Sequence, residues 1–189
     1  MKFSRNGPEL PDRLLQAHED GNVVFFCGAG ISYPAGLKGF DWLTTEIFNQ
    51  CGETPDPLEE GAISQKRYDG ALDLLEHRLK DRKFLRQKLA AVLTPNLLKK
   101  ESRATHEALL TLSKDRSGST RLVTTNFDRI FFKVEKTHRH YPAPMLPVPK
   151  KWNWDGVVYL HGLLTDPESE SSLNQLIVTI GDFVRAYLP

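Results

Sequence analysis

The chain has 189 residues, a length that suits one domain or one domain with part of a second. Hydrophobic residues make up 40% and charged residues 26%, which supports a buried core and argues against disorder. The net charge of +1 gives no overall field that would attract nucleic acid or an anionic membrane. No apolar stretch approaches the roughly 20 residues of a membrane-spanning helix. Residues 1–12 lack the apolar core of a secretory signal, so we expect a cytoplasmic protein.

Apolar residues recur at helical spacing in several segments of the chain. The helices predicted in chain order span about 10–21, 39–52, 64–81, 81–93, 104–114 and 128–136. Between the second and third of these helices, residues 53–61 are predicted to form a loop. A last helix is expected from residue 181 and would be cut off by the end of the sequence.

Short apolar runs predict the strands. They cover residues 22–27, 121–127, 157–162 and 174–180, and the first is a continuous apolar run, typical of a strand buried on both faces. Residues 141–156 contain four prolines, the first at Pro142 and the last at Pro149. Because proline cannot donate to a helix or a strand ladder, this segment is predicted to be an extended loop that crosses the surface.

Strands separated by helices require crossover connections and therefore a mainly parallel sheet. We predict an α/β, Rossmann-like three-layer fold, with helices on both sides of the sheet and a helical insert at about 53–113. Four strands are few for such a sheet, and the last helix is cut short. We therefore expect residues 1–189 to be the N-terminal part of a domain that is apparently truncated at its C-terminus.

The end of the first predicted strand carries Gly28-Ala29-Gly30. Ligands of open parallel sheets bind at the carboxyl ends of the strands. Glycines at such an end let the backbone turn sharply and let a ligand approach, and free N–H groups there can hold a phosphate. The third glycine of the dinucleotide fingerprint is absent, and no Gly-Lys-Ser/Thr follows, which excludes a Walker loop. A plain tight turn remains the alternative interpretation.

Polar residues also follow the second and third of these strands. Asn126 offers two donors and an acceptor, which suit sugar hydroxyls or a carboxamide. Asp128 either supports the same site or simply caps the next helix. His161 stands at the end of strand 157–162, where a histidine can act as a general base near neutral pH, although a lone histidine is more often structural.

The sequence gives no sign of a metal site. There are two cysteines, Cys27 and Cys51, too few for a four-ligand structural zinc site, and no Cys-x-x-Cys or His-Glu-x-x-His spacing occurs. Cys27 lies in an apolar strand and is predicted to be a small buried hydrophobic residue.

The ordered set Gly-Ala-Gly-Ile-Ser at 28–32, Thr-Thr-Asn-Phe-Asp at 124–128 and Leu-His-Gly at 160–162 resembles the sirtuin-like NAD-binding family. The resemblance spans about residues 23–162 and implies a Rossmann-type sheet that binds NAD+. It implies that the residues that contact NAD+ are Gly28, Ala29, Gly30, Ile31, Ser32, Thr125 and Asp128. It also implies that Asn126 and His161 are catalytic, with His161 as the base.

The chain departs from the protein deacetylases of that family. Those enzymes follow the glycine turn with Gly-Ile-Pro-Asp-Phe-Arg and carry a four-cysteine zinc module after the catalytic histidine. Here the turn is followed by Tyr-Pro-Ala-Gly-Leu-Lys-Gly-Phe at 33–40, and both cysteines precede His161. The chain is more similar to the bacterial branch of sirtuin-like domains. In that branch the domain hydrolyses NAD+ in anti-phage defence and is fused to, or paired with, a sensor.

The resemblance thus implies an NAD+ hydrolase that cleaves the nicotinamide N-glycosidic bond and gives nicotinamide and ADP-ribose. It would be the NAD-depleting effector of an abortive-infection system and would need no metal. The expected partners are further copies of the chain or a sensor such as an ATPase, an Argonaute-like protein or a long C-terminal region, with no nucleic acid or membrane. The alternatives are a non-catalytic NAD or ADP-ribose sensor and, less favoured, an NAD-dependent protein deacylase.

Overall fold

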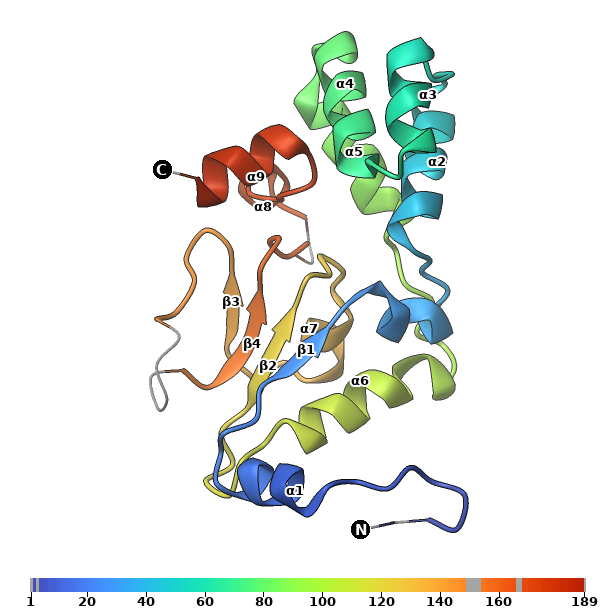
Figure 1. Ribbon diagram of the computed structural model, residues 1–189. Helices are drawn as coiled ribbons and strands as arrows, with labels where there is room; N and C mark the ends of the chain where they lie inside the picture. Colours follow the sequence, from blue (N-terminus) through green and yellow to red (C-terminus); the bar gives the residue numbers. More distant parts are fainter. Residues whose placement is uncertain (1, 3, 149–153, 166–167, 189) are drawn as a thin grey trace.

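A parallel sheet organises the molecule (Figure 1). The computed structural model describes residues 2, 4–148, 154–165 and 168–188. Its four strands are β1 (Phe25–Cys27), β2 (Arg121–Thr124), β3 (His140–Pro142) and β4 (Gly156–Tyr159). All neighbours are parallel, in the order β1-β2-β4-β3. The fold is therefore α/β and Rossmann-like, and the predicted fold class is confirmed.

Helices precede, connect and follow these strands. They are α1 (Asp12–Glu19), the 3-10 helix η1 (Ala29–Ala35), α2 (Phe40–Cys51), α3 (Pro57–Ser64), α4 (Tyr68–Leu79), α5 (Arg82–Val92), α6 (Glu101–Leu112), α7 (Ile130–Val134), α8 (Glu170–Asn174) and α9 (Ile180–Tyr187). The helices predicted near 10–21, 39–52, 64–81, 81–93, 104–114 and 128–136 correspond to α1, α2, α4, α5, α6 and α7. The helix expected from 181 corresponds to α9.

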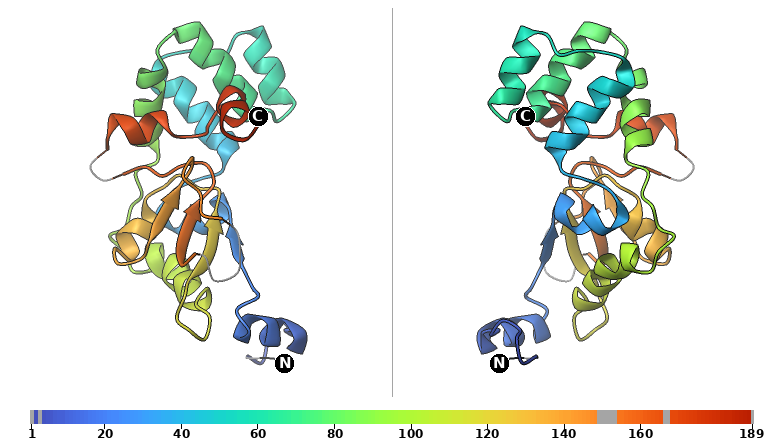
Figure 2. Two further views of the ribbon diagram at one scale, coloured as in Figure 1. Left: turned by 90° about the vertical axis from the view of Figure 1, so that its left-hand side faces the viewer. Right: turned by 90° about the vertical axis from the view of Figure 1, so that its right-hand side faces the viewer.

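One face of the sheet packs against α6 and α7, which lie on the same side of the strands in both views of Figure 2. The core of this side contains Leu122, Val157 and Tyr159 from the strands, with Leu110 from α6 and Phe131 from α7. Side chains alternate along a strand, so Phe26 points away from this core, and it is 67% exposed. Cys27 is buried in the core, as predicted.

Helices α2 to α5 pack together into a unit that we call the helical unit. In Figure 1 the strands point toward it, so it stands beyond their carboxyl ends. Its core leucines, among them Leu72 and Leu89, belong to one continuous cluster with Phe127 after β2, Leu164 after β4 and Val178 before α9. This shared apolar cluster fixes the helical unit over the end of the sheet where ligands are expected.

The predicted loop at 53–61 is wrong, because α3 begins within it. Asp56 accepts hydrogen bonds from the backbone N–H groups of Leu58 and Glu59, each at 2.9 Å, and Pro57 fills the first helical position. The Glu59 carboxylate in turn accepts from the Asp56 N–H at 2.8 Å. Asp-Pro-x-Glu is therefore a capping box with a proline start, although Pro55 and Pro57 favour a turn when they are considered alone.

The strand predicted at 174–180 is also wrong. This segment contains the end of α8, a connection and the start of α9, and its apolar residues Leu176, Ile177 and Val178 are buried without strand pairing. The structure instead has the strand β3, which begins at His140 and extends into the proline-rich segment 141–156 that is predicted to be a loop. It tolerates Pro142 because it is an edge strand, paired with β4 alone. Residues 149–153 of that predicted loop lie outside the described residues.

A buried group of charges joins α9 to the helical unit. Arg86 on α5 is fully buried, and its Nη2 donates to Glu76 at 2.7 Å and to Asp182 at 2.5 Å. Arg82 also pairs with Asp182, at 2.8 Å. Burial by itself raises the pKa of Asp182, but the two arginines and backbone N–H groups hold it at about 2. The start of α9 is thus fixed by ion pairs to α5, and Glu76 on α4 pairs with the same two arginines.

His106 on α6 is a second buried titratable group. It is fully buried, its ring lies edge-to-face with Phe131 at 4.6 Å, and neither ring nitrogen has a hydrogen-bond partner among the described residues. Burial lowers the pKa of His106 to about 4, so the folded protein holds the ring neutral near pH 7.

We expect Asp182→Asn to lower the free energy of unfolding by about 2–3 kcal/mol, because it leaves the buried Arg86 guanidinium undercompensated. Arg185→Gln is the control, since it removes an exposed partner of the same carboxylate, 2.6 Å away, and should cost less than about 1 kcal/mol. Urea unfolding at pH 7 measures both. Equal losses in the two variants would contradict the assignment of the stabilisation to Arg86.

We expect stability to fall as the pH is lowered from about 6.5 to about 4. The unfolded chain binds a proton at His106 with an ordinary pKa of roughly 6.5, whereas the folded chain resists it until about pH 4. The stabilisation is therefore complete above pH 6.5, and about 3 kcal/mol of it is lost by pH 4. Urea unfolding measured across this pH range should show that the free energy of unfolding of His106→Phe changes much less with pH than that of the wild type. An unchanged slope in that variant would exclude His106 as the cause.

Candidate functional site

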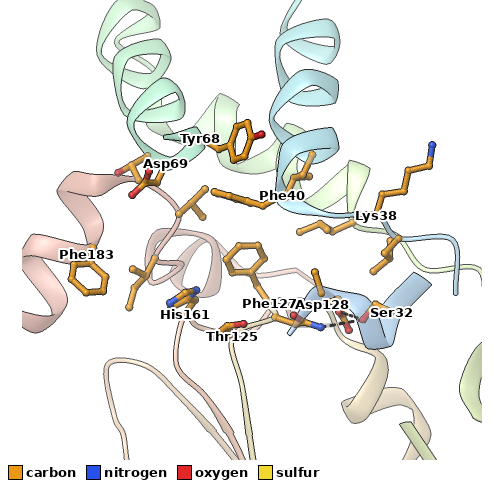
Figure 3. Close-up of a pocket in the computed structure, with 18 of the residues that line it drawn as sticks. Ser32, Lys38, Phe40, Tyr68, Asp69, Thr125, Phe127, Asp128, His161 and Phe183 are labelled. Carbon is orange, nitrogen blue, oxygen red and sulfur yellow. Dashed lines mark hydrogen bonds between the residues drawn. The ribbon is translucent and has the colours of Figure 1, made fainter. Parts of the chain in front are cut away.

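A cavity of about 400 Å³ lies between the strand ends and the helical unit. Figure 3 shows Ser32, Thr125, Asp128 and His161 along one side, and Phe40, Tyr68 and Asp69 along the opposite side. Phe183 from α9 lies beside both groups. The cavity is thus placed at the carboxyl edge of the sheet, where parallel folds of this class bind ligands.

The turn that follows β1 leaves open space beside its backbone. After Cys27 the chain turns into η1, and a side chain added at Gly30 would meet nothing within 4 Å. At Gly28 an added Cβ would meet only the Thr125 hydroxyl, at 3.8 Å, and its φ of −123° suits any residue. Neither glycine is required by the local backbone or by packing. Their small size leaves room for another molecule to approach the backbone.

Asn126 follows β2 and is tied to the turn after β1. Its Nδ2 donates to the backbone oxygen of Gly28 at 3.2 Å and to the Ser32 hydroxyl at 3.1 Å. These two bonds occupy both amide N–H groups and set the orientation of the side chain. The Oδ1 atom accepts no hydrogen bond from any residue that the structure describes. The amide therefore offers the cavity a free acceptor.

Asp128 fixes the position of Ser32 in this arrangement. It is 4% exposed, and its Oδ2 accepts a hydrogen bond from the Ser32 hydroxyl at 2.8 Å. Its Oδ1 accepts from the Ile130 N–H at 3.0 Å, so the carboxylate also contacts the start of α7, the helix-capping alternative. Burial raises the pKa of Asp128, and these hydrogen bonds offset part of the rise. Asn126, Ser32 and Asp128 thus form one continuous hydrogen-bond chain.

His161 follows β4 and is half-buried. Its backbone oxygen accepts from the Ile177 N–H at 2.9 Å, and its ring lies 6.3 Å from the ring of Phe127. Burial lowers the pKa of His161, while an interaction with the backbone of Thr125 partly restores it. The ring is therefore neutral at physiological pH, which is the form that can accept a proton.

Gly162 explains why a glycine follows the histidine. Its φ is +88°, and a Cβ there would lie 3.1 Å from the backbone oxygen of Gln175. This glycine is required by the fold, because the chain turns sharply to bring His161 beside residue 177. Gly28 and Gly30 differ from Gly162, because neither has a positive φ and neither is crowded by neighbouring atoms.

The structure brings most of the predicted site residues together. The predicted residues that line the cavity are Ala29, Ser32, Thr125, Asn126, Asp128 and His161. Gly28 and Gly30 are exposed in the adjoining turn and do not line it. Ile31 is directed elsewhere, because it packs against the core between the sheet and α6.

Sequence reasoning missed the opposite wall of the cavity. The sequence predicts for Phe40 only a place at the start of an amphipathic helix, and it predicts no role for Tyr68, Asp69 and Phe183, which also line the cavity. The rule that places ligands at strand ends does not say which helical residues fold over those ends. We find no signal in the sequence that would have identified these residues.

Metal-ligating clusters and membrane-spanning helices are both absent from the described part of the chain. There, no group of three or more histidine, cysteine, aspartate or glutamate side chains is arranged to hold a metal ion. Within the same residues, no helix is long and apolar enough to cross a membrane.

Comparison with known proteins gives one informative similarity. The whole chain is 34% identical, over 196 aligned residues, to the uncharacterized protein y4cA of Sinorhizobium fredii (strain NBRC 101917 / NGR234). The chain spans only 16% of the length of that protein. No protein-family model matches the chain.

The two kinds of glycine can be separated by experiment. Gly162→Ala should lower the free energy of unfolding by about 1–2 kcal/mol or more, because alanine is strained at positive φ and its Cβ is crowded. Gly30→Ala should not lower it, since the added methyl group enters open space. Thermal or urea unfolding of the two variants checks this. A marked loss of stability in Gly30→Ala would show that this glycine serves the fold.

Proposed function

We propose that the cavity binds NAD+ and that the protein hydrolyses its nicotinamide N-glycosidic bond, giving nicotinamide and ADP-ribose. One observation carries the proposal. Asn126, with a free acceptor oxygen, and His161, held neutral by burial, line the same cavity beside an open glycine turn. This is the combination that such a reaction needs: an anion-accepting turn, a group that orients sugar or water, and a base.

In this proposal the pyrophosphate lies against the turn at Gly28–Gly30. The open space beside Gly28 and Gly30 supports this placement, because it lets a ligand approach the backbone closely. The ribose that carries nicotinamide then extends toward Asn126, and the nicotinamide ring enters the cavity. Ser32 and Asp128 contact the ligand little or not at all, and act by fixing the amide of Asn126.

The reaction follows from these positions. The bond between the ribose C1′ and the ring nitrogen breaks, and nicotinamide leaves with the electron pair as a neutral molecule. Positive charge develops on the ribose in the transition state. Water adds to C1′ while the Asn126 Oδ1 accepts a hydrogen bond from the water or from a ribose hydroxyl. His161 takes the proton that the water releases.

We further propose that the activity is cytoplasmic, depletes NAD+ and is gated, because continuous hydrolysis would kill the cell that makes the protein. Its biological role would be that of an effector in bacterial anti-phage defence. Gating would come from assembly of several copies or from a fused or paired sensor. The similarity to a much longer protein, y4cA, agrees with a domain that works as one part of a larger chain.

We expect His161→Ala and Asn126→Ala each to lower the rate of NAD+ hydrolysis by about 10²–10⁴-fold without unfolding the protein. His77→Ala is the matched control, because His77 is exposed on α4 and does not line the cavity. NAD+, nicotinamide and ADP-ribose are measured by chromatography with the longest natural form of the protein, in cells with and without phage.

The outcomes distinguish the two leading functions. Loss of NAD+ with a silent His161→Ala variant supports the hydrolase. Turnover like that of the wild type in either site variant would contradict the catalytic assignment. Binding of NAD+ with no consumption under any condition would instead indicate a sensor, in which Asn126 and His161 only bind the ligand.

A further inference from the structure

The wall opposite the strand ends combines aromatic rings with one acidic group. Phe40 at the start of α2 and Tyr68 at the start of α4 lie edge-to-face, with their ring centres 6.4 Å apart. Asp69 lies next to Tyr68 and faces the same cavity (Figure 3). None of these residues belongs to the sequence motifs that follow the strands. The helical unit therefore adds its own chemistry to the cavity.

Asp69 has unused capacity as an acceptor. It is half-buried, and its Oδ1 accepts the N–H of Gly70 at 2.9 Å. Among the residues that the structure describes, no cation pairs with its carboxylate. An acidic residue in the first turn of a helix is favourable by itself, and Asp41 in the first turn of α2 is another example. Asp69 differs from Asp41 because it lines the cavity, whereas Asp41 is exposed and does not.

Aromatic faces and a carboxylate on one wall favour a flat ring that carries positive charge. The electron-rich face of an aromatic ring attracts a cation, and the attraction grows when water is excluded. An unpaired carboxylate in a largely apolar cavity adds to that preference, although the lysines Lys38 and Lys66 also line the cavity without pairing with Asp69 among the described residues. A neutral ring of the same shape would gain the packing without the charge interaction.

We propose that Phe40, Tyr68 and Asp69 bind the pyridinium ring of the oxidised nucleotide, and that Asp69 selects this cationic ring over the neutral reduced ring. The inference rests on the proposed function, which places the ribose at Asn126 and so directs the attached ring toward this wall. It names Asp69 as a specificity-determining residue contributed by the helical unit.

The proposal has a kinetic consequence. The positive charge leaves the ring as the glycosidic bond breaks, so the attraction of Asp69 for the ring is strongest before the transition state. An interaction of this kind tightens substrate binding and does not speed the chemical step. Loss of Asp69 should therefore raise KM and leave kcat unchanged or higher.

The test measures binding by titration calorimetry with the full chain and three probes. The first is carba-NAD+, in which a methylene replaces the ribose ring oxygen so that the bond is not hydrolysed. The second is NADH, whose reduced ring is neutral, and the third is ADP-ribose, which has no ring at this position. The variants are Asp69→Asn, which keeps an oxygen for the Gly70 N–H, and Asp41→Asn as the matched control.

We expect the wild type and Asp41→Asn to bind carba-NAD+ about tenfold more tightly than NADH. In Asp69→Asn this preference should disappear, KM for NAD+ should rise about tenfold without a fall in kcat, and ADP-ribose should bind as before. If ADP-ribose binds the wild type but Asp69→Asn keeps the preference, the role of Asp69 is wrong and the proposed site stands. If the wild type binds no ADP-ribose, the proposed function fails and this inference fails with it.

Discussion

The cavity depends on the hydrogen-bond chain from Asn126 through Ser32 to Asp128. Asn126 and Asp128 follow β2, and Ser32 lies in η1 after β1. The hydrogen bonds among them therefore join two strand ends that are more than ninety residues apart in sequence. The parallel pairing of β1 with β2 brings these ends together, and the buried carboxylate of Asp128 holds them there. The direction of the Asn126 amide, and with it the free acceptor in the cavity, follows from this chain.

Much of the sheet side of the site could be predicted from the sequence, because local patterns determine it. An apolar run that ends in a glycine turn, in Thr-Thr-Asn-Phe-Asp or in His-Gly predicts a strand and a polar strand end. The geometry of parallel sheets then brings these ends to one edge. The α/β fold, the helices from α4 to α7 and the buried position of Cys27 follow from the same local reasoning.

The remaining features depend on tertiary structure or on competing local signals. The apolar run near Val178 predicts a strand wrongly, because burial in a loop and burial in a sheet give the same apolar pattern. The sequence does not predict β3 because Pro142 and the prolines that follow it argue against a strand, yet an edge position tolerates Pro142. The wall formed by Phe40, Tyr68 and Asp69 depends on how the helical unit packs over the sheet, which no local pattern encodes.

The short connection between His161 and α9 has a mechanical meaning. The backbone of His161 is held by Ile177, and the next residues lead directly into α9, whose first turn is bound to α5 by ion pairs. The histidine, α9 and the helical unit are therefore connected by one series of hydrogen bonds and ion pairs. A force that displaces α9 from the helical unit acts on the backbone of His161 through a single short segment, so the position of this side chain reports how firmly α9 is seated.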